Sequence, residues 1–292
     1  MRAAAIFGLD SSETDLKPFQ KDSAVEWLIG LPSRSSEADA ILIFGGDGTI
    51  HRHLPRLVQF QLPVLIVPCG SGNDFARSLG ISSRRESLSA WRTFCSSARN
   101  LRCIDLGIIK AISNEHASNP HYFCCIGGVG LDTEVTRRAN QLPRWIRGHG
   151  GYLLSLPSAL LRFAAVPIRL SLPTSPNQRR VVSRAETPIV LAAFANSPTY
   201  GDGMKIAPHA QLDDGKLDVC IVHEIGKIKL LSLFPTVYFG RHLGISGVEY
   251  LQTDRLRIDT EEPIDIYADG EFICQTPADI TVAPAALRVI HP

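Results

Sequence analysis

Two glycine-rich turns hold the residues of this sequence that are best suited to bind a phosphate group. The first is Gly45-Gly46-Asp47-Gly48-Thr49. The second is Pro68-Cys69-Gly70-Ser71-Gly72-Asn73-Asp74. Glycine permits positive φ angles and lets backbone N–H groups approach a ligand closely. A helix that starts at such a turn adds N–H donors and the positive end of its dipole. The predicted chemistry is the binding of a polyphosphate, with Thr49 and Ser71 donating their hydroxyls.

Asp47 is the exception in the first turn, because its carboxylate would repel a phosphate. It could instead cap the following helix, brace the loop or bind a magnesium-associated water. A capped strand–helix turn without a ligand explains one such turn equally well, but two turns at consecutive strand ends favour a binding site. The pattern is neither GxxxxGK[ST] nor GxGxxG, so it is neither a P-loop nor a Rossmann fingerprint.

The elements around these turns predict an α/β domain with a parallel sheet. Continuous apolar runs at 38–46 and 62–70 are typical of strands that are buried on both faces. A further strand is expected at 2–8. Helices are expected at 22–32, at roughly 49–60 and at 85–98. In a parallel sheet ligands bind at the carboxyl ends of the strands, which is where both turns fall.

The alternation of strand and helix candidates ends at about residue 105. Short strand candidates separated by turns follow, and they predict an antiparallel, β-rich second domain. We expect an α/β nucleotide-binding domain over 1–105 and the β-rich domain over 106–284, as a rigid pair that faces a shared cleft. Helical interruptions are expected at 151–165 and near 226–239. The strand candidates are 106–112, 121–128, 168–173, 179–184, 188–196, 216–224, 250–259, 264–271, 280–284 and 287–292.

Composition narrows the class of protein. The 292 residues are 45% hydrophobic, and the net charge of +1 gives no indication of nucleic-acid binding. The seven cysteines lack CxxC spacing, which favours a reduced, cytoplasmic protein over a disulfide framework or a zinc site. The first residues lack the apolar h-region of a signal peptide and no apolar run reaches about 18 residues, so we expect neither a leader nor a membrane span, and any membrane contact should be peripheral.

The motifs together resemble the diacylglycerol kinase catalytic-domain family, particularly its soluble bacterial lipid kinases. "GGDGT" alone is shared with NAD kinases and phosphofructokinases, but its combination with "GSGND", "DDGKLD" and "DGE" is specific to the lipid-kinase branch. The motifs follow the family's order over nearly the whole chain. They are "GGDGT", "PCGSGNDFAR", "IDLG", "GGVGLDTEV", "GHGGY", "FANSPTYGDGMKIAPHAQLDDGKLDV", "ADGE" and "LRVIHP".

The resemblance implies a two-domain protein that binds ATP between an α/β domain and a β-sandwich, with the tail at about 285–292 returning to the first domain. The implied nucleotide-lining residues are Gly46, Gly48, Thr49, Gly70, Ser71, Asn73 and Asp74, together with Gly45, Asp47 and Gly72 of the same turns. Asp74, Asp105 and Asp132 match acids of a water-linked network around the ATP-bound Mg²⁺. This fits the ion, because Mg²⁺ keeps several waters and few direct carboxylates.

A second, structural magnesium site is implied by "QLDDGKLD". Gln211, Asp214 and Lys216 occupy the matching positions. Asp214 would supply a carboxylate, whereas Gln211 and Lys216 would supply backbone carbonyls, since an ammonium cannot bind a cation. The alternative is an Asp-Asp-Gly hairpin turn without a metal.

Asp269 and Glu271 of "ADGE" are the candidate catalytic pair. Phosphoryl transfer to an alcohol needs an acceptor for the hydroxyl proton, which a carboxylate can supply. Alternation along a strand would place both acids on the same side, and either could be the base. The alternative is a β-turn with exposed acids.

The sequence departs from the family pattern at three places. These are "IFGLDSS", where Ser11 and Ser12 are candidates to replace the usual phosphate contacts, His51-Arg52, and Pro55 inside a predicted helix. A membrane contact is expected at 137–147, where Arg137, Arg138, Arg144 and Arg147 flank Trp145. The apolar stretch 153–166 that follows fits either a packed helix or a membrane-facing one.

The sequence therefore predicts an ATP- and Mg²⁺-dependent kinase of lipid metabolism and phospholipid biosynthesis, acting on a hydroxyl of diacylglycerol or a related lipid. The expected partners are the lipid substrate, a membrane surface and, as one option, a second copy in a homodimer; nucleic acid is not expected. The alternatives are an NAD kinase-like or other small-molecule kinase, and a nucleotide-binding protein with little catalysis.

Overall fold

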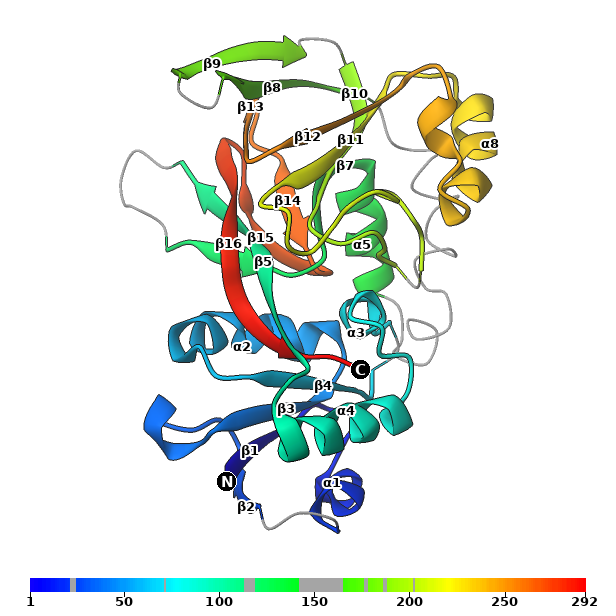
Figure 1. Ribbon diagram of the computed structural model, residues 1–292. Helices are drawn as coiled ribbons and strands as arrows, with labels where there is room; N and C mark the ends of the chain where they lie inside the picture. The colour runs from blue at the N-terminus through cyan, green and yellow to red at the C-terminus, as the bar shows by residue number, and fades with distance from the viewer. Residues whose placement is uncertain are drawn as a thin grey trace. The chain divides into compact units, whose positions relative to one another are not determined.

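The computed structural model describes residues 1–21, 25–70, 72–112, 119–141, 165–175, 178–185, 188–201 and 203–292. The chain divides into two compact units (Figure 1). The first unit consists of Met1–Asp105 and Pro284–Pro292, and the second of Leu106–Ala283. The chain passes from one unit to the other within strands β5 (Leu101–Ala111) and β16 (Ala278–Ile290).

The first unit has a parallel sheet in the order β2-β1-β3-β4-β16. Its strands are β1 (Arg2–Phe7), β2 (Glu26–Ile29), β3 (Ala40–Gly45) and β4 (Val64–Pro68), completed by the end of β16. Every residue of β3 is buried, as the continuous apolar run predicts for a central parallel strand. The α/β class of this unit is therefore confirmed.

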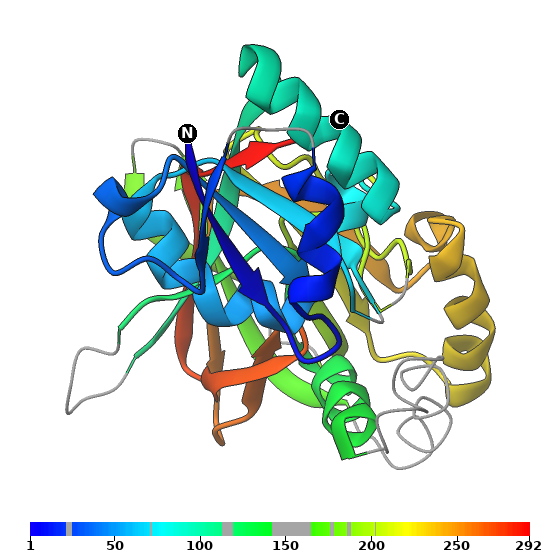
Figure 2. The ribbon, with the colours of Figure 1, turned by 90° about the horizontal axis from the view of Figure 1, so that it is seen from below.

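The helices of the first unit cover both faces of this sheet. They are α1 (Glu13–Gln20), α2 (Asp47–Phe60), α3 (Asp74–Ser78) and α4 (Arg84–Ser97), and a 3-10 turn η1 covers Ser35–Glu37. Helices α1 and α4 lie side by side on one face, with α2 on the other (Figures 1 and 2). Opposite faces are expected, because the β1–β2 and β3–β4 crossovers run in opposite directions across the sheet. Helix α2 continues through Pro55.

The helix that we expected at 22–32 is wrong where the structure describes these residues. Glu26–Ile29 form β2, which pairs in parallel with β1. The spacing of Trp27, Leu28 and Ile29 also fits a helix, but the unpaired edge of β1 offers ladder hydrogen bonds to these bulky and β-branched residues. Trp27 packs against Trp91 of α4, with ring centroids 5.7 Å apart. Residues 22–24 lie outside the described part of the chain, and the first helix is α1 instead.

The second unit is an antiparallel β structure. One set of strands follows the order β15-β14-β7-β10-β11-β12, and another contains β6-β5 and β16-β13-β8-β9. One hydrophobic core takes residues from both sets, among them Phe123, Leu170, Phe194 and Ile258. Two sets of strands that share one core form a β-sandwich, which confirms the fold class expected for this part. The strands are β6 (His121–Phe123), β7 (Ile126–Gly130), β8 (Val166–Ser175), β9 (Gln178–Ala185), β10 (Pro188–Ala195), β11 (Leu217–His223), β12 (Val248–Thr253), β13 (Arg255–Thr260), β14 (Asp265–Ala268) and β15 (Glu271–Gln275).

Several boundaries in this unit differ from the sequence-based prediction. The candidates 121–128 and 250–259 each divide into two strands, whereas 280–284 and 287–292 belong to the single strand β16. The helix expected near 226–239 is α8 (Lys227–Tyr238), followed by the 3-10 turn η2 (His242–Gly244). Helix α5 (Leu131–Gln141) was not predicted. The helix expected at 151–165 lies, apart from its last residue, outside the described residues.

Candidate functional site

The two glycine turns touch each other through their backbones. A Cβ atom built on Gly70 would lie 2.5 Å from Cα of Gly46, and one built on Gly46 would lie 2.9 Å from Cα of Gly70. Backbone N–H of Cys69 also donates to the carbonyl of Gly45, at 3.1 Å. Side chains cannot occupy this contact, so glycine at 46 and 70 brings the ends of β3 and β4 into one continuous loop surface.

Asp47 joins the first turn to the helix that follows the second. Its Oδ2 accepts from backbone N–H of Asp74 at 2.9 Å, and its Oδ1 accepts from N–H of Phe75 at 3.0 Å. These are orphan donors of the first turn of α3, so Asp47 caps a helix 27 positions downstream (74 − 47) rather than its own. Of the three roles considered for Asp47, bracing the loop is the one that the geometry shows.

The second turn is held by its own polar side chains. The amide of Asn73 accepts from Gly70 N–H at 3.0 Å and donates to the Gly70 carbonyl at 2.5 Å. Asn73 has a φ of +51°, a conformation that asparagine tolerates better than most residues. Arg77 contacts the buried Asp74 carboxylate at 2.5 Å and donates to the Gly72 carbonyl at 2.9 Å. The structure does not describe Ser71.

The two serines of the first loop make local contacts in the structure. The hydroxyl of Ser11 donates to the carbonyl of Phe44 at 2.5 Å, and Ser12 is the N-cap of α1. Asp105 lies on β5 with 4% of its surface exposed, and its Oδ1 accepts from backbone N–H of Ala285 at 2.7 Å. This bond fixes the returning strand β16 to the first unit. Asp132 is the second residue of α5 in the second unit.

The expectation that alternation on a strand aligns Asp269 with Glu271 is wrong. Asp269 and Gly270 form the turn between β14 and β15, with φ angles of +50° and +85°. Two consecutive positive φ angles are typical of a type I′ hairpin turn, for which Asp-Gly is a preferred pair. Glu271 is the first residue of β15, and its side chain is exposed. The two acids therefore have different environments.

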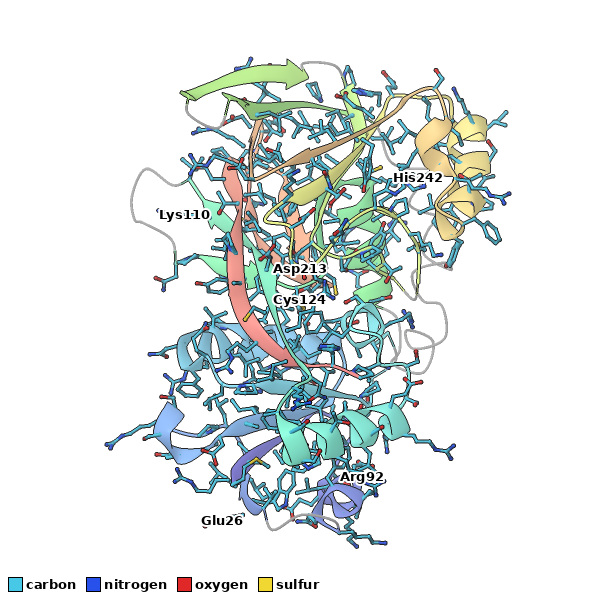
Figure 3. All side chains as sticks on the ribbon, in the orientation of Figure 1. Glu26, Arg92, Lys110, Cys124, Asp213 and His242 are labelled. Atoms are coloured by element: carbon cyan, nitrogen blue, oxygen red, sulfur yellow. The ribbon has the colours of Figure 1, made fainter. Side chains whose placement is uncertain are left out.

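The carboxylate of Asp269 is bound by the turn between β6 and β7. Its Oδ2 accepts from N–H of Cys124 at 2.8 Å, and its Oδ1 accepts from N–H of Cys125 at 2.8 Å and of Ile126 at 3.3 Å. Cys124, labelled in Figure 3, also contacts Oδ2 through its Sγ at 3.3 Å. Amide donors on both oxygens stabilise the charged carboxylate. These contacts fasten the β14–β15 hairpin to the β6–β7 turn.

Cys124, Cys125 and Asp269 also offer ligand atoms within 4.8 Å of one another, the spacing of a metal site. The amide donors that already point at the Asp269 oxygens would be displaced by, or would repel, a cation there. The hydrogen bonds explain the cluster without a metal. The two cysteines were not singled out from the sequence, because their proximity to Asp269 depends on contacts between distant segments.

The loop before β11 contains Gln211, Asp214 and Lys216, the residues that we expect from the sequence to form a structural magnesium site. Gln211 and Lys216 are exposed, and Oδ1 of Asp214 accepts from Lys216 N–H at 3.0 Å across Gly215, whose φ is +72°. This is the local Asx turn of a hairpin-like loop. Only Oδ1 of Asp214 takes part in this hydrogen bond, so the carboxylate is compatible with a bound Mg²⁺ ion.

Asp218 of the same motif was missed in the sequence. It lies on β11 with 1% exposure, and it accepts from the Tyr250 hydroxyl at 2.7 Å and from Gln252 Nε2 at 3.1 Å. Burial raises the pKa of the Asp218 carboxyl, which the hydrogen bonds from Tyr250 and Gln252 partly offset. The signal for it is an acid at an inward position of the apolar run 217–222, where a polar residue needs partners.

The basic segment expected to contact a membrane is only partly described. Arg137 and Arg138 lie on α5 and pair with Glu134, at 2.8 Å and 2.5 Å. The single carboxylate of Glu134 therefore offsets one of their two positive charges within the helix. Arg144, Trp145 and Arg147, and the stretch 153–164, lie outside the described residues.

Comparisons with known proteins agree with this architecture. Residues 7–107 match the family model for the diacylglycerol kinase catalytic domain, and residues 126–291 match that for the YegS C-terminal NAD kinase beta sandwich-like domain. A diacylglycerol kinase of Mycobacterium tuberculosis is 32% identical over 260 residues, which cover 87% of this chain and 77% of that protein. The chain belongs to the diacylglycerol kinase family. It is accordingly a lipid kinase.

Two solved structures share the fold. A diacylglycerol kinase from Bacillus anthracis str. Sterne superposes with a TM-score of 0.66 at 18% identity, over 100% of this chain and 97% of that one. An NAD kinase from Archaeoglobus fulgidus, determined in complex with ATP, has a TM-score of 0.53 at 15% identity, over 99% of this chain and 93% of that one. The fold of this lipid kinase is thus also found in an NAD kinase.

Proposed function

We propose that this lipid kinase transfers the γ-phosphoryl group of ATP, with Mg²⁺, to a hydroxyl of diacylglycerol or a related lipid. The observation that carries the proposal is the backbone contact between Gly46 and Gly70, braced by Asp47. A surface from which side chains are excluded suits a polyphosphate. The names of the related protein and of the ATP-bound NAD kinase structure support the choice of substrates.

The nucleotide contacts that we propose all belong to the two turns. Gly48 and Thr49 lie in the first turn of α2, whose N-terminus favours negative charge. Thr49 lies against Gly45, since a Cβ on Gly45 would be 2.7 Å from the Thr49 hydroxyl oxygen. Asn73 and Gly72 shape the opposite side of this surface, and Ser71 is proposed as a further hydroxyl donor. The first unit is then the nucleotide-binding domain and the second the lipid-substrate domain.

Mg²⁺ fits the donor set, because hard carboxylate oxygens and water are the ligands it prefers. We propose that Asp74, Asp105 and Asp132 hold it through water molecules. Bound there, Mg²⁺ would neutralise charge on the transferred phosphoryl group. Arg77 and Ala285 N–H orient the carboxylates of Asp74 and Asp105. Gln211, Asp214 and Lys216 are proposed as a second, structural site.

The acceptor for the substrate proton is proposed to come from Asp269 and Glu271. Asp269 is held rigidly by three amide donors, which makes its position precise but also makes it part of the framework. The exposed Glu271 has no such anchoring in the described residues. Replacing Asp269 therefore perturbs both the turn and the chemistry, whereas Glu271→Gln removes charge with little effect on the turn.

A defined assay tests the proposal. Diacylglycerol in detergent micelles is incubated with γ-labelled ATP, with and without Mg²⁺, alongside NAD as a competing acceptor. We expect label in the lipid only when Mg²⁺ is present, and none in NAD. Label in NAD but not in any lipid would replace this proposal with an NAD kinase activity. If the protein binds ATP but transfers label to neither acceptor, the function would instead be nucleotide binding without catalysis.

A further inference from the structure

Helix α8 is apolar on the face that packs against the second unit. Leu233 and Val237 are buried. Leu230 and Phe234 pack on a small buried cluster that consists of Leu131, Val135, Val190 and Val222. This face attaches the helix to its unit. Figures 1 and 2 show α8 at the periphery of its unit.

The opposite face of α8 is also apolar, although the fold does not bury it. Ile228 is 88% exposed and Leu231 is 55% exposed, and Phe239, which directly follows the helix, is 72% exposed. At about 100° per residue these three side chains and the exposed Pro235 fall within roughly 80° of one another. They form one stripe along the helix, which we call the outer stripe.

Lysines border the outer stripe on both sides. Lys227 and Lys229 project about 100° to either side of Ile228. The Nζ of Lys229 donates to the Ser246 carbonyl at 2.8 Å, so its ammonium is held at the edge of the stripe. The helix sequence KIKLLSLFPTVY contains no acidic residue. An apolar stripe with cations along its edges complements a surface that is apolar inside and anionic at its boundary.

We propose that the outer stripe of α8 docks this lipid kinase on an anionic phospholipid bilayer. The inference rests on the proposed function, because diacylglycerol resides in a bilayer and the enzyme must reach it there. Interfacial helices insert an apolar face into the acyl boundary while lysines remain among the headgroups. A soluble surface gains nothing from a contiguous exposed apolar stripe, which otherwise promotes aggregation.

Vesicle sedimentation tests the docking. Full-length protein is mixed with vesicles of phosphatidylcholine alone, or with vesicles that also contain about 30% of the anionic lipid phosphatidylglycerol. We expect stronger binding to the anionic vesicles, weakened by salt. Each lysine near the surface is worth about fivefold in affinity, so Lys227→Gln with Lys229→Gln should cost about 25-fold at low salt. Ile228→Ser, Leu231→Ser and Phe239→Ser together should cost at least about tenfold.

The matched control removes exposed apolar side chains of the first unit. Leu9 is 72% exposed and Ile29 is 49% exposed, and their replacement by Ser should leave vesicle binding unchanged. If the outer-stripe variant binds vesicles as tightly as the wild type, the proposal is overturned. Two other results with unchanged vesicle affinity also overturn it. In one, the variant only converts a dimer to a monomer; in the other, it only makes residues 153–166 more sensitive to proteolysis.

Activity in detergent micelles separates this inference from the proposed function. The outer-stripe variant should phosphorylate micellar diacylglycerol at the wild-type rate, but should lose activity on vesicles. A wild type that binds vesicles through α8 and phosphorylates no lipid would overturn the proposed function and leave the docking intact. A variant that is active in micelles and unimpaired on vesicles would overturn the docking alone.

Discussion

The carboxylate of Asp47 should be the main brace between the two glycine turns, and its removal should loosen a helix that lies 27 positions away in the chain. Asp47→Ala deletes both hydrogen bonds to the start of α3, at 2.9 Å and 3.0 Å. Asp47→Asn keeps one acceptor oxygen and turns an NH₂ group toward the other donor. The pair of variants therefore forms a graded series on one position.

The magnitude follows from the number and type of bonds lost. A hydrogen bond to a charged group contributes about 1.5–3 kcal/mol, and partial exposure of Asp47 places this pair at the lower end. Asp47→Ala should then cost about 2–4 kcal/mol of the free energy of unfolding, which lowers Tm by at least about 4 °C. Asp47→Asn should lose roughly half as much.

Hydrogen exchange locates the effect. The amides of Asp74 and Phe75 should exchange faster in both variants, because these are the donors that Asp47 satisfies. Asp10→Asn, an exposed acid in the same unit, is the control and should change neither Tm nor exchange. Unchanged Tm and unchanged exchange at Asp74 and Phe75 in Asp47→Ala would refute the bracing role.

Three further predictions concern the proposed catalytic pair, the buried Asp218 and the contact between Gly46 and Gly70. Glu271→Gln should lower lipid phosphorylation by about 10²–10⁴-fold with little change in ATP affinity, and full turnover in both Glu271→Gln and Asp269→Asn would remove the pair from catalysis. Burial raises the pKa of Asp218 in the folded protein. The wild type should therefore lose stability relative to Asp218→Asn as pH rises from about 3.9, the pKa of Asp in unfolded chains, through the raised folded pKa. Denaturant unfolding at several pH values measures this difference in stability, and a difference that does not change with pH would contradict the prediction. Gly70→Ala should abolish ATP binding in calorimetry, since its Cβ would meet Cα of Gly46 at 2.5 Å, whereas Gly244→Ala, whose Cβ meets nothing within 4 Å, should bind normally.

The sequence could predict the features that depend on local chemistry. Strands β3 and β4 follow from continuous apolar runs, and the turns after them follow from their glycines. Helix α4 follows from its periodicity and from the capping box of Ser83 and Glu86. Local signals decide these elements because each is stabilised mainly by residues within it or by burial of its own apolar face.

Features that depend on distant partners could not be predicted in the same way. Glu26–Ile29 became a strand because the edge of β1 was open to it. Asp47 caps α3 rather than α2, and no local pattern reports on a partner 27 positions away. For Asp269 the Asp-Gly turn signal was present in the sequence, but its three amide donors come from residues 124–126. In each case a tertiary contact assigns the role.

Transfer of label from ATP to lipid, measured on wild type and Gly70→Ala in parallel, tests the central claim most directly. A total lipid extract is presented in micelles with γ-labelled ATP and Mg²⁺, and the lipids are separated afterwards. The account predicts a labelled phospholipid with the wild type, none with Gly70→Ala, and unimpaired labelling with Gly244→Ala. Labelling of lipid by Gly70→Ala at the wild-type rate would contradict a phosphate site built from the contact between the two glycine turns, and no labelled lipid from the wild type would contradict the proposed reaction.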